Sequence, residues 1–349
     1  MNDPIRFAVL SFAHFHANFW SEAINDASDA VLAGIWDDDE ERGRDAAARY
    51  DTEFWPDLEA LLAASDAVGI TSETSKHVAL VEAAARHHCA ILLEKPMART
   101  LDECRQILHA VETSGVKFMQ NFPKRYDPIN AELAQIVQSG ALGKIALVRV
   151  RHANSHLLEL GQTAAGEWFA SPELAGGGSL LDEGIHAADL LLWLLGEPEA
   201  ACAAVSNTTL GLPLDDSGIA LFKYPNGAIA EITASGTLVA APESIEIFGT
   251  EGSAVLTGVD LASREFAQPP YLRVFKRGDE RGVWQGSPTV PDFRTGHFHQ
   301  NGPLHFLRYL AGEVEPVVAL EDGWKSLAMI EAAYAAASTG QWQPVATTL

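Results

Sequence analysis

The first 120 residues alternate short apolar runs with stretches of helical periodicity. Four apolar runs, each rich in Val, Ile, Leu or Ala and each ending at a polar cluster, lie at Arg6–Leu10, Val31–Trp36, Ala67–Thr71 and Ala90–Leu93. Ala- and Glu-rich stretches such as Asp39–Tyr50 and Lys76–His87 lie between them. Buried strands that alternate with helices are typical of βαβ units around a parallel sheet. The pattern therefore predicts an α/β domain with a parallel sheet over residues 1–121.

The pattern changes after about residue 122, where the strand-like stretches become longer and alternate apolar with polar residues. These stretches are Lys144–Arg151, Ser217–Tyr224, Ala228–Thr237, Glu243–Phe248 and Ser253–Thr257. The turn Pro225-Asn226-Gly227 joins two of them, and helices are predicted over about Leu180–Leu195 and Trp324–Ser338. Gly161–Gly178 is the most loop-like segment. We expect residues 122–349 to form an α+β domain whose open, mostly antiparallel sheet is covered on one face.

Composition limits the class of protein and its partners. A chain of 349 residues exceeds the roughly 250–300 that one core supports, which agrees with two domains. The chain is 47% hydrophobic and 20% charged, so it is globular. Its formal net charge of −23 repels phosphate backbones and anionic lipid, so neither nucleic acid nor a membrane is an expected partner.

Cysteine usage and the N-terminal residues bear on the compartment. The three cysteines, Cys89, Cys104 and Cys202, are odd in number and form no CxxC pair, so we expect neither a disulfide framework nor a structural zinc. The first residues lack a basic region followed by a long apolar stretch, and no apolar run is long enough to span a membrane. We expect a cytoplasmic protein.

The turn after the first apolar run is a candidate phosphate-binding loop. It reads Ser11-Phe12-Ala13-His14-Phe15-His16 where a dinucleotide fingerprint would read GxGxxG. Ser and Ala are still small where the backbone must approach a pyrophosphate, and the N–H groups of a helix N-terminus still attract an anion. The alternative is a plain strand-to-helix turn.

Two further segments strengthen the dinucleotide hypothesis. Asp37 ends the second predicted strand, where a carboxylate can accept hydrogen bonds from both hydroxyls of the adenosine ribose, although a surface acid or helix cap is the alternative. Thr71 and Ser72 end the third strand, where ligands bind in open α/β sheets. His77 follows them, and it could equally serve local packing or face a nicotinamide.

The fourth predicted strand ends in Glu94-Lys95-Pro96, and here the chain resembles the Gfo/Idh/MocA family of oxidoreductases, whose hallmark is that tripeptide. GGGSLLDEGIHAADLLLWLLG (Gly176–Gly196) resembles the family's GG-x-L-x-D-x-G-x-H pattern. Three other stretches are also similar to the family: AGIWDDDEERGRDAAARY, GALGKIALVRV and EDGWKSLAMIEAAYAAASTG. The missing glycine loop is the departure from the family.

The resemblance implies a Rossmann domain that binds NAD, followed by an open-sheet domain, with a sugar, polyol or inositol-like substrate held against the nicotinamide. It also implies a homodimer or homotetramer formed through the open sheet. The expected cofactor-binding residues are Ser11, Phe12, Ala13, His14, Phe15, His16, Asp37, Thr71, Ser72, His77, Glu94, Lys95 and Asn121.

Hydride transfer from a carbinol needs a base for the hydroxyl proton and a group that holds the developing alkoxide. Asp182 and His186 are four residues apart on a predicted helix, so both project from one face. Histidine exchanges protons near neutral pH, which makes His186 the expected base, with Asp182 orienting it or binding a neighbouring hydroxyl. Lys95 would hold the reacting oxygen, or serve as the base itself. A histidine on so apolar a helix could instead be a core residue or a cap.

The substrate-binding candidates are Lys95, Arg125, Tyr126, His152, Asn154, His156, Trp168, Asp182 and His186. His152 and Asn154 share one face of a predicted strand, and Trp168 could stack on a sugar ring. His297 and His299 have the spacing of metal ligands, but no carboxylate joins them at helical spacing, so we expect no metal.

These observations lead to three hypotheses. The first is an NAD-dependent dehydrogenase acting on CH–OH groups. The second is an NAD-dependent glycoside hydrolase that oxidises a sugar transiently and eliminates its glycosidic group. The third, a non-catalytic NAD sensor, would not need Lys95, Asp182 and His186. Asp37 favours NAD over NADP because it repels a 2′-phosphate; Arg42 and Arg44, on the following helix, are the cations that could offset it.

Overall fold

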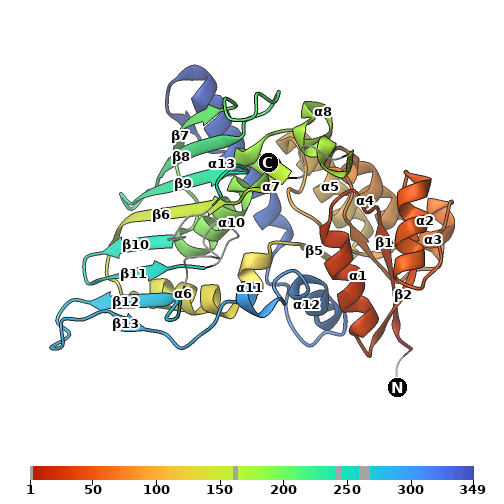
Figure 1. The fold of residues 1–349 in the computed structure, drawn as a ribbon, viewed down its shortest axis with the longest axis horizontal. Helices are drawn as coiled ribbons and strands as arrows, with labels where there is room; N and C mark the ends of the chain where they lie inside the picture. The colour runs from red at the N-terminus through yellow and green to blue at the C-terminus, as the bar shows by residue number, and fades with distance from the viewer. Residues whose placement is uncertain (1–2, 160–163, 240–244, 259–267) are drawn as a thin grey trace. The chain divides into compact units, whose positions relative to one another are not determined.

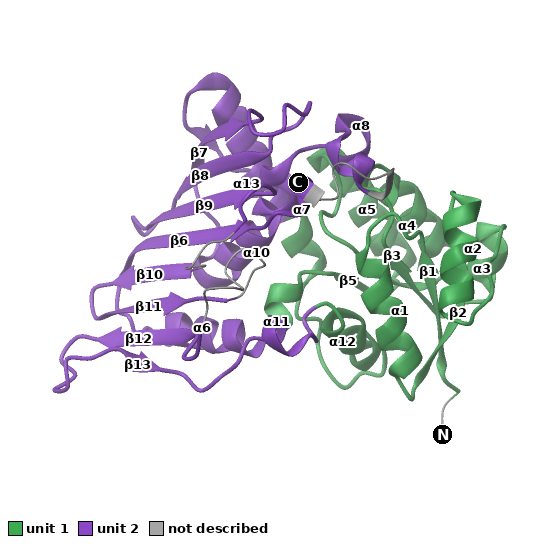
Figure 2. Ribbon diagram, in the orientation of Figure 1, with its two compact units in different colours: residues 1–126, 299–324 green, residues 127–298, 325–349 purple. Residues whose placement is uncertain are grey.

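The chain divides into two compact units (Figures 1 and 2). The computed structural model describes residues 3–159, 164–239, 245–258 and 268–349. Unit 1 consists of residues 1–126 and 299–324, and unit 2 consists of residues 127–298 and 325–349.

Unit 1 contains a five-stranded parallel sheet in the order β2-β1-β3-β4-β5. Its strands are β1 (Ile5–Leu10), β2 (Ala30–Trp36), β3 (Ala67–Ile70), β4 (Ala90–Leu93) and β5 (Phe118–Gln120). The four strands predicted from the apolar runs are confirmed. Every residue of β3 and β4 is buried, as expected for inner strands of a parallel sheet with both faces covered.

Helices connect these strands in the βαβ manner. They are α1 (His16–Asp26), α2 (Glu40–Arg49), α3 (Leu58–Ala63), α4 (His77–Arg86) and α5 (Leu101–Ser114), with the short 3₁₀ turn η1 (Thr74–Lys76) before α4. Unit 1 also contains the 3₁₀ turn η2 (Pro123–Tyr126) after β5 and the helix α12 (Asn301–Leu310). Helix α1 packs against α12, and α4 packs against α5. Asp39 caps α2 by accepting the N–H of Arg42, and two acidic residues follow in its first turn.

The segment 299–324 differs from the sequence-based division, which placed it in the second domain. Phe306 and Leu307 of α12 join the buried apolar cluster that contains Phe7 and Trp20. The ammonium of Lys117 also donates to the backbone carbonyl of Tyr309. The apolar face of α12 is therefore part of the core of unit 1, although this helix follows the sheet by nearly 200 residues.

Unit 2 contains a nine-stranded sheet in the order β13-β12-β11-β10-β6-β9-β8-β7-β14. Its strands are β6 (Ile145–Ala153), β7 (Ala200–Ser206), β8 (Ser217–Lys223), β9 (Ile229–Ser235), β10 (Ile245–Gly249), β11 (Gly252–Leu256), β12 (Leu272–Lys276), β13 (Gln285–Gly286) and β14 (Gln343–Pro344). β6 pairs in parallel with β9, and the other described pairs are antiparallel, which confirms a mostly antiparallel sheet. The predicted strand Glu243–Phe248 corresponds to β10, which is described from Ile245. Residues 243–244 lie outside the described residues.

The helices of unit 2 are mostly short. They are α6 (Pro128–Gln138), α7 (His156–Glu159), η4 (Ala164–Ala170), α8 (Pro172–Ala175), α9 (Ser179–Asp182), α10 (Gly184–Leu195) and α11 (Asp292–Thr295), and α13 (Leu320–Thr339) begins in unit 1 and continues here. The segment predicted as a loop is thus partly helical over residues 164–175, while its first residues, 161–163, lie outside the described residues.

The single helix predicted over Leu180–Leu195 is wrong in one respect. It is broken at Glu183, where α9 ends and α10 begins. A Cβ atom at Gly184 would lie 3.2 Å from a side-chain carbon of Leu180 and 3.4 Å from Cβ of Ala234 on β9, so the backbone approaches the sheet closely here. The break places Asp182 and His186 on different helices.

One face of the large sheet is covered and the other is open. α10 packs on β6 and β9, so Ala220, Phe222 and Ile232 on that side are fully buried. The alternate residues Ile219 and Leu221 of β8 are exposed. Among the helices of the described ranges, none combines the length and apolar composition that crossing a membrane requires.

Replacing Phe306 by Ala tests whether α12 belongs to the core of unit 1. Its ring is fully buried, so Phe306→Ala should lower the free energy of unfolding by about 3–5 kcal/mol, measured by chemical denaturation. Leu304→Ala, on the exposed side of the same helix, is the matched control and should change it by less than about 1 kcal/mol. Equal, small effects of both substitutions would contradict the assignment.

Candidate active site

The glycine-free loop after β1 begins at a strained residue. Ser11 has a φ of 74°, in the left-handed region that favours glycine. Its hydroxyl oxygen accepts the N–H of Ala13 at 3.2 Å, and its carbonyl oxygen accepts the hydroxyl of Thr71 at 2.6 Å. Side-chain hydrogen bonds therefore hold a turn for which a glycine would be the ordinary choice.

The next residues of the loop are held in the same way. The N–H of Phe12 donates to Oδ2 of Asp37 at 2.7 Å, and the N–H of His14 donates to the carbonyl of Thr71 at 3.0 Å. The N–H of His16 donates to Nδ1 of His14 at 3.2 Å, at the point where α1 begins. The loop thus connects the ends of β1, β2 and β3, where open α/β sheets bind ligands.

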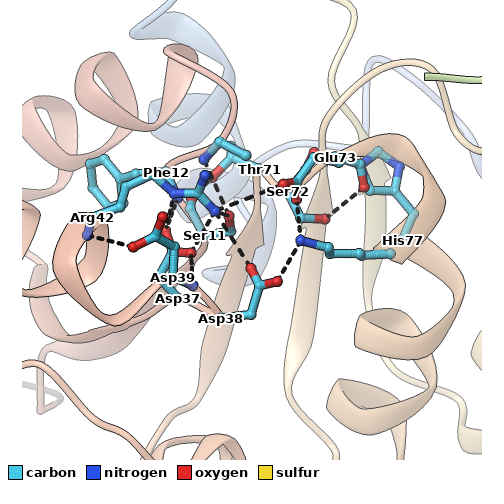
Figure 3. Close-up of polar contacts among 12 residues, drawn as sticks. Ser11, Phe12, Asp37, Asp38, Asp39, Arg42, Thr71, Ser72, Glu73 and His77 are labelled. Carbon is cyan, nitrogen blue, oxygen red and sulfur yellow. Dashed lines mark hydrogen bonds and ion pairs between the residues drawn. The ribbon is translucent and has the colours of Figure 1, made fainter. Parts of the chain in front are cut away.

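Asp37 lies directly after β2, and its side chain is fully buried (Figure 3). Arg42 from α2 donates two hydrogen bonds to its carboxylate, from Nε to Oδ2 at 2.8 Å and from Nη2 to Oδ1 at 2.6 Å. Oδ1 also accepts the N–H of Asp39 at 3.0 Å. Because both carboxylate oxygens of Asp37 already accept two donors, a ribose diol can reach them only when Arg42 moves aside.

A second cation, Lys76, shares the acceptors Asp38 and Glu73 with Arg42. The ammonium of Lys76 is 2.5 Å from Oδ2 of Asp38 and 2.8 Å from Oε2 of Glu73. Burial lowers the pKa of Lys76, but these two contacts outweigh it and leave the pKa above its ordinary value. Arg44 is not part of this network, because it pairs with Glu40 on its own helix.

Glu94 directly follows β4, and its carboxylate lies near the rings of His14 and His16. Its Oε2 accepts the side-chain amide of Asn121 at 2.8 Å, and its Oε1 contacts Nδ1 of His16. Burial raises the pKa of Glu94 to about 7. The ring of His299 lies 4.1 Å from that of His16, so His299 has a neighbour that the sequence did not indicate.

His14, His16 and Glu94 are close enough to suggest a metal site. However, Nδ1 of His14 accepts the N–H of His16, so a neutral ring carries its proton on Nε2, the atom that faces Glu94 at 4.0 Å. That atom then has no lone pair for a metal ion. We assign no metal to this group.

The remaining candidates in unit 1 have structural partners. His77 lies between the carbonyls of Met97 and Ser72, at 3.1 and 3.3 Å, and burial lowers its pKa. Nη1 of Arg125 is 3.0 Å from Oδ2 of Asp322, and the ring of Tyr126 packs against His305. Arg125 and Tyr126, which were expected at the substrate, thus contact segment 299–324 within unit 1. Lys95 is 4% exposed and lies beside Glu94.

The second group of candidates surrounds the break between α9 and α10 in unit 2. Oε2 of Glu183 is 2.7 Å from Nδ1 of His152 on β6, and Oε1 accepts the side-chain amide of Asn154 at 2.7 Å. The ring of His186 stacks on that of His152 with centroids 4.6 Å apart. His152 and His186, expected from their types and spacing, therefore lie together. Glu183 was missed; the signal was an acidic residue within an otherwise apolar helical pattern.

His156 extends this cluster towards Asp182. Its Nε2 is 3.4 Å from Oδ2 of Asp182, and its Nδ1 is 3.4 Å from Oε1 of Glu183. A pocket beside it is lined by His156, Leu157, Phe169, Ala170, Gly178, Ser179, Asp182, Leu212, Leu214 and Asp215. Trp168, proposed as a stacking platform for a sugar, is itself stacked on Phe169 at 3.9 Å.

Gly178 allows the backbone before α9 to approach its neighbours. A Cβ atom there would lie 2.1 Å from the carbonyl oxygen of Asp215, so no larger residue fits. The hydroxyl of Tyr334 donates to Oδ1 of Asp215 at 2.7 Å and accepts the N–H of Gly178 at 3.1 Å. Burial raises the pKa of Asp215. These contacts fix the turn that presents Asp182.

Comparisons with known proteins agree with this arrangement. Residues 5–122 match an oxidoreductase family with an NAD-binding Rossmann fold, and residues 130–255 match the C-terminal domain of the same family. The chain belongs to the GFO/IDH/MocA oxidoreductase family. Its unit 1 sheet is the family's NAD-binding domain, and the dehydrogenase class expected from the resemblance is confirmed.

Named relatives cover most of the chain. A 1,5-anhydro-D-fructose reductase of Ensifer adhaerens is 29% identical over 81% of both chains. A D-apiose dehydrogenase of Paraburkholderia graminis is 26% identical over 95% of this chain and 86% of its own. The fold is similar to that of the WlbA dehydrogenase from Bordetella pertussis, solved with NADH and UDP-GlcNAcA, with a TM-score of 0.82, 23% identity, and 100% and 99% of the chains covered.

Asp37 should determine the preference for NAD. A 2′-phosphate about 4 Å away would be repelled by roughly 4 kcal/mol per unit charge at an effective dielectric near 20, which solvent reduces. We expect kcat/KM with NAD to exceed that with NADP by about 10²-fold, and Asp37→Ser to abolish this preference because it also releases Arg42.

Asp39→Ser is the matched control, since it removes a nearby charge and leaves a residue that can still cap α2. It should retain most of the NAD preference. Equal use of both cofactors by the wild type, or an unchanged preference in Asp37→Ser, would contradict the role of Asp37.

Proposed function

We propose that this enzyme oxidises a carbinol of a sugar, polyol or inositol-like substrate with NAD. The observation that carries the proposal is the cluster of His152, His186, Glu183, His156 and Asp182 around the break between α9 and α10, in a chain whose N-terminal domain is an NAD-binding fold. Reductases and dehydrogenases of sugars and inositol among the relatives support the substrate class. Asp37 and the loop Ser11–His16 would hold the cofactor.

The residues divide the chemistry between them. The bound nicotinamide supplies a hydride acceptor. His186 takes the hydroxyl proton as the carbon–hydrogen bond breaks, and Asp182 orients it or binds an adjacent hydroxyl. Lys95 donates to the oxygen on which negative charge develops. In reverse, His186 returns the proton to the alkoxide.

Glycoside cleavage through transient oxidation would employ the same groups. The names of the relatives describe net reduction or dehydrogenation, which favours the dehydrogenase over this alternative. A screen of free sugars, polyols and glycosides with NAD, following both NADH and released aglycone, separates the two.

Alanine substitutions test the catalytic assignment. Lys95→Ala and His186→Ala should each lower kcat by at least about 10²-fold while NAD still binds, measured by cofactor titration. His297→Ala removes an exposed histidine and should leave both quantities unchanged. Near-normal turnover in His186→Ala would transfer the role of base to Lys95.

We also propose that the enzyme is a cytoplasmic homodimer or homotetramer formed through the open face of the large sheet. Four apolar side chains on that face are 36–49% exposed: Leu147, Ile219, Leu221 and Ile229. Arg149, on the same face, lies between Glu231 and Glu246, and the strand register places the Arg149–Glu231 pair among these apolar side chains. None of the three cysteines, all within the described residues, is in a disulfide, which fits a reducing compartment.

A charge placed in this patch should separate the copies. Ile219→Arg should convert the oligomer to monomers at micromolar concentration, measured by sedimentation velocity, because a buried unpaired guanidinium is costly. Val283→Arg, a matched change at an exposed position elsewhere in unit 2, should leave the oligomer intact. A monomeric wild type, or an unchanged Ile219→Arg oligomer, would contradict this interface.

A further inference from the structure

Glu183 is the most deeply placed acidic group of the cluster in unit 2. Its residue is 6% exposed, and its two oxygens face different partners. Oε2 lies 2.7 Å from His152, while Oε1 accepts from Asn154 at 2.7 Å and lies 3.4 Å from His156. One carboxylate thus organises β6, the start of α7 and the break between α9 and α10.

This geometry favours a charged pair. A buried carboxylate is stable as an anion only with donors and a cation beside it. Burial raises the pKa of Glu183, but the contact with His152 outweighs it and holds the pKa below its ordinary value. A charged carboxylate 2.7 Å from Nδ1 favours the protonated form of His152.

The protonated ring of His152 faces His186. The two rings are stacked at 4.6 Å with an angle of 29° between their planes. Two stacked imidazolium ions repel each other, so a cation on His152 disfavours a second proton on His186.

We propose that Glu183 is a positioning residue that keeps His152 protonated against His186 and thereby keeps His186 in the neutral form that a base requires. This inference rests on the proposed function, in which His186 takes the substrate's proton.

The other groups around His186 would act in the opposite direction. Among the described residues of unit 2, Asp182 on α9 and Asp189 further along α10 are acidic and favour a protonated His186, while His156 lies on α7. The covered face of β9, on which α10 packs, presents uncharged Ala230, Ile232 and Ala234. His152 on β6 is therefore the cation that offsets these two carboxylates.

Glu183→Gln tests the inference. The pKa of His186, followed by NMR of ¹⁵N-histidine-labelled enzyme, should rise by about one pH unit. The cause is that His152, without the carboxylate of Glu183 beside it, becomes neutral and no longer repels a proton on His186. The acid limb of kcat/KM should move to higher pH by the same amount, so activity falls about tenfold at pH values below that limb.

Two further variants make the result specific. His152→Gln removes the cation directly and leaves the Glu183 carboxylate without it, so it should raise the pKa of His186 at least as much, and the double variant should not exceed it. Glu132→Gln removes an equal charge from α6, where Glu132 accepts hydroxyls of Ser287 and Thr289, and should leave that pKa unchanged.

The outcomes separate this inference from the proposed function. An unchanged or lower pKa of His186 in folded Glu183→Gln or His152→Gln overturns the inference. A raised pKa with an unmoved acid limb supports the inference and contradicts the assignment of His186 as the base. Activity that falls equally at every pH, while the pKa of His186 and the acid limb of kcat/KM stay unchanged, shows that Glu183 is only structural and also overturns the inference.

Discussion

A carboxylate removed from water must be neutralised by donors, and this constraint shapes both groups of functional residues. In unit 1, Asp37 accepts the N–H of Phe12 and both branches of Arg42, which ties the loop after β1 to the end of β2. In unit 2, Glu183 does the same for β6 and the helices α9 and α10. Each acid connects separate segments of its unit and has a basic side chain beside it.

The Asp37–Arg42 pair has a consequence for cofactor binding. In the binding mode that we propose, a ribose at Asp37 would replace the guanidinium of Arg42, so the energy of that ion pair would reduce the affinity that the ribose provides. Arg42 has other acceptors within reach, because Oδ1 of Asp38 is 3.5 Å away and Oε1 of Glu73 is 3.9 Å away. Arg42 can therefore release Asp37 without losing all of its ionic partners.

Local patterns in the sequence predicted the regular parts of the fold. The strands of unit 1 were recognisable because parallel strands buried on both faces are continuous apolar runs. The three-residue strand β5 and the Ala-rich β7 carry no alternation and were not predicted. The return of α12 to unit 1 depends on contacts of Phe306 with residues nearly 300 positions earlier, which no local pattern contains. Glu183 was missed for the same reason, because its partner His152 is 31 residues earlier on β6 and lies beside it only in the folded protein.

The proposed reaction passes a hydride from a carbinol carbon of the substrate to NAD. Polyols or sugars deuterated at one carbinol carbon at a time, incubated with the enzyme and NAD, test it through the mass of the NADH formed. We expect deuterated NADH, in an amount equal to the oxidised product, for one labelled position alone. Consumption of substrate without NADH, or NADH that carries no deuterium from any position, would contradict it.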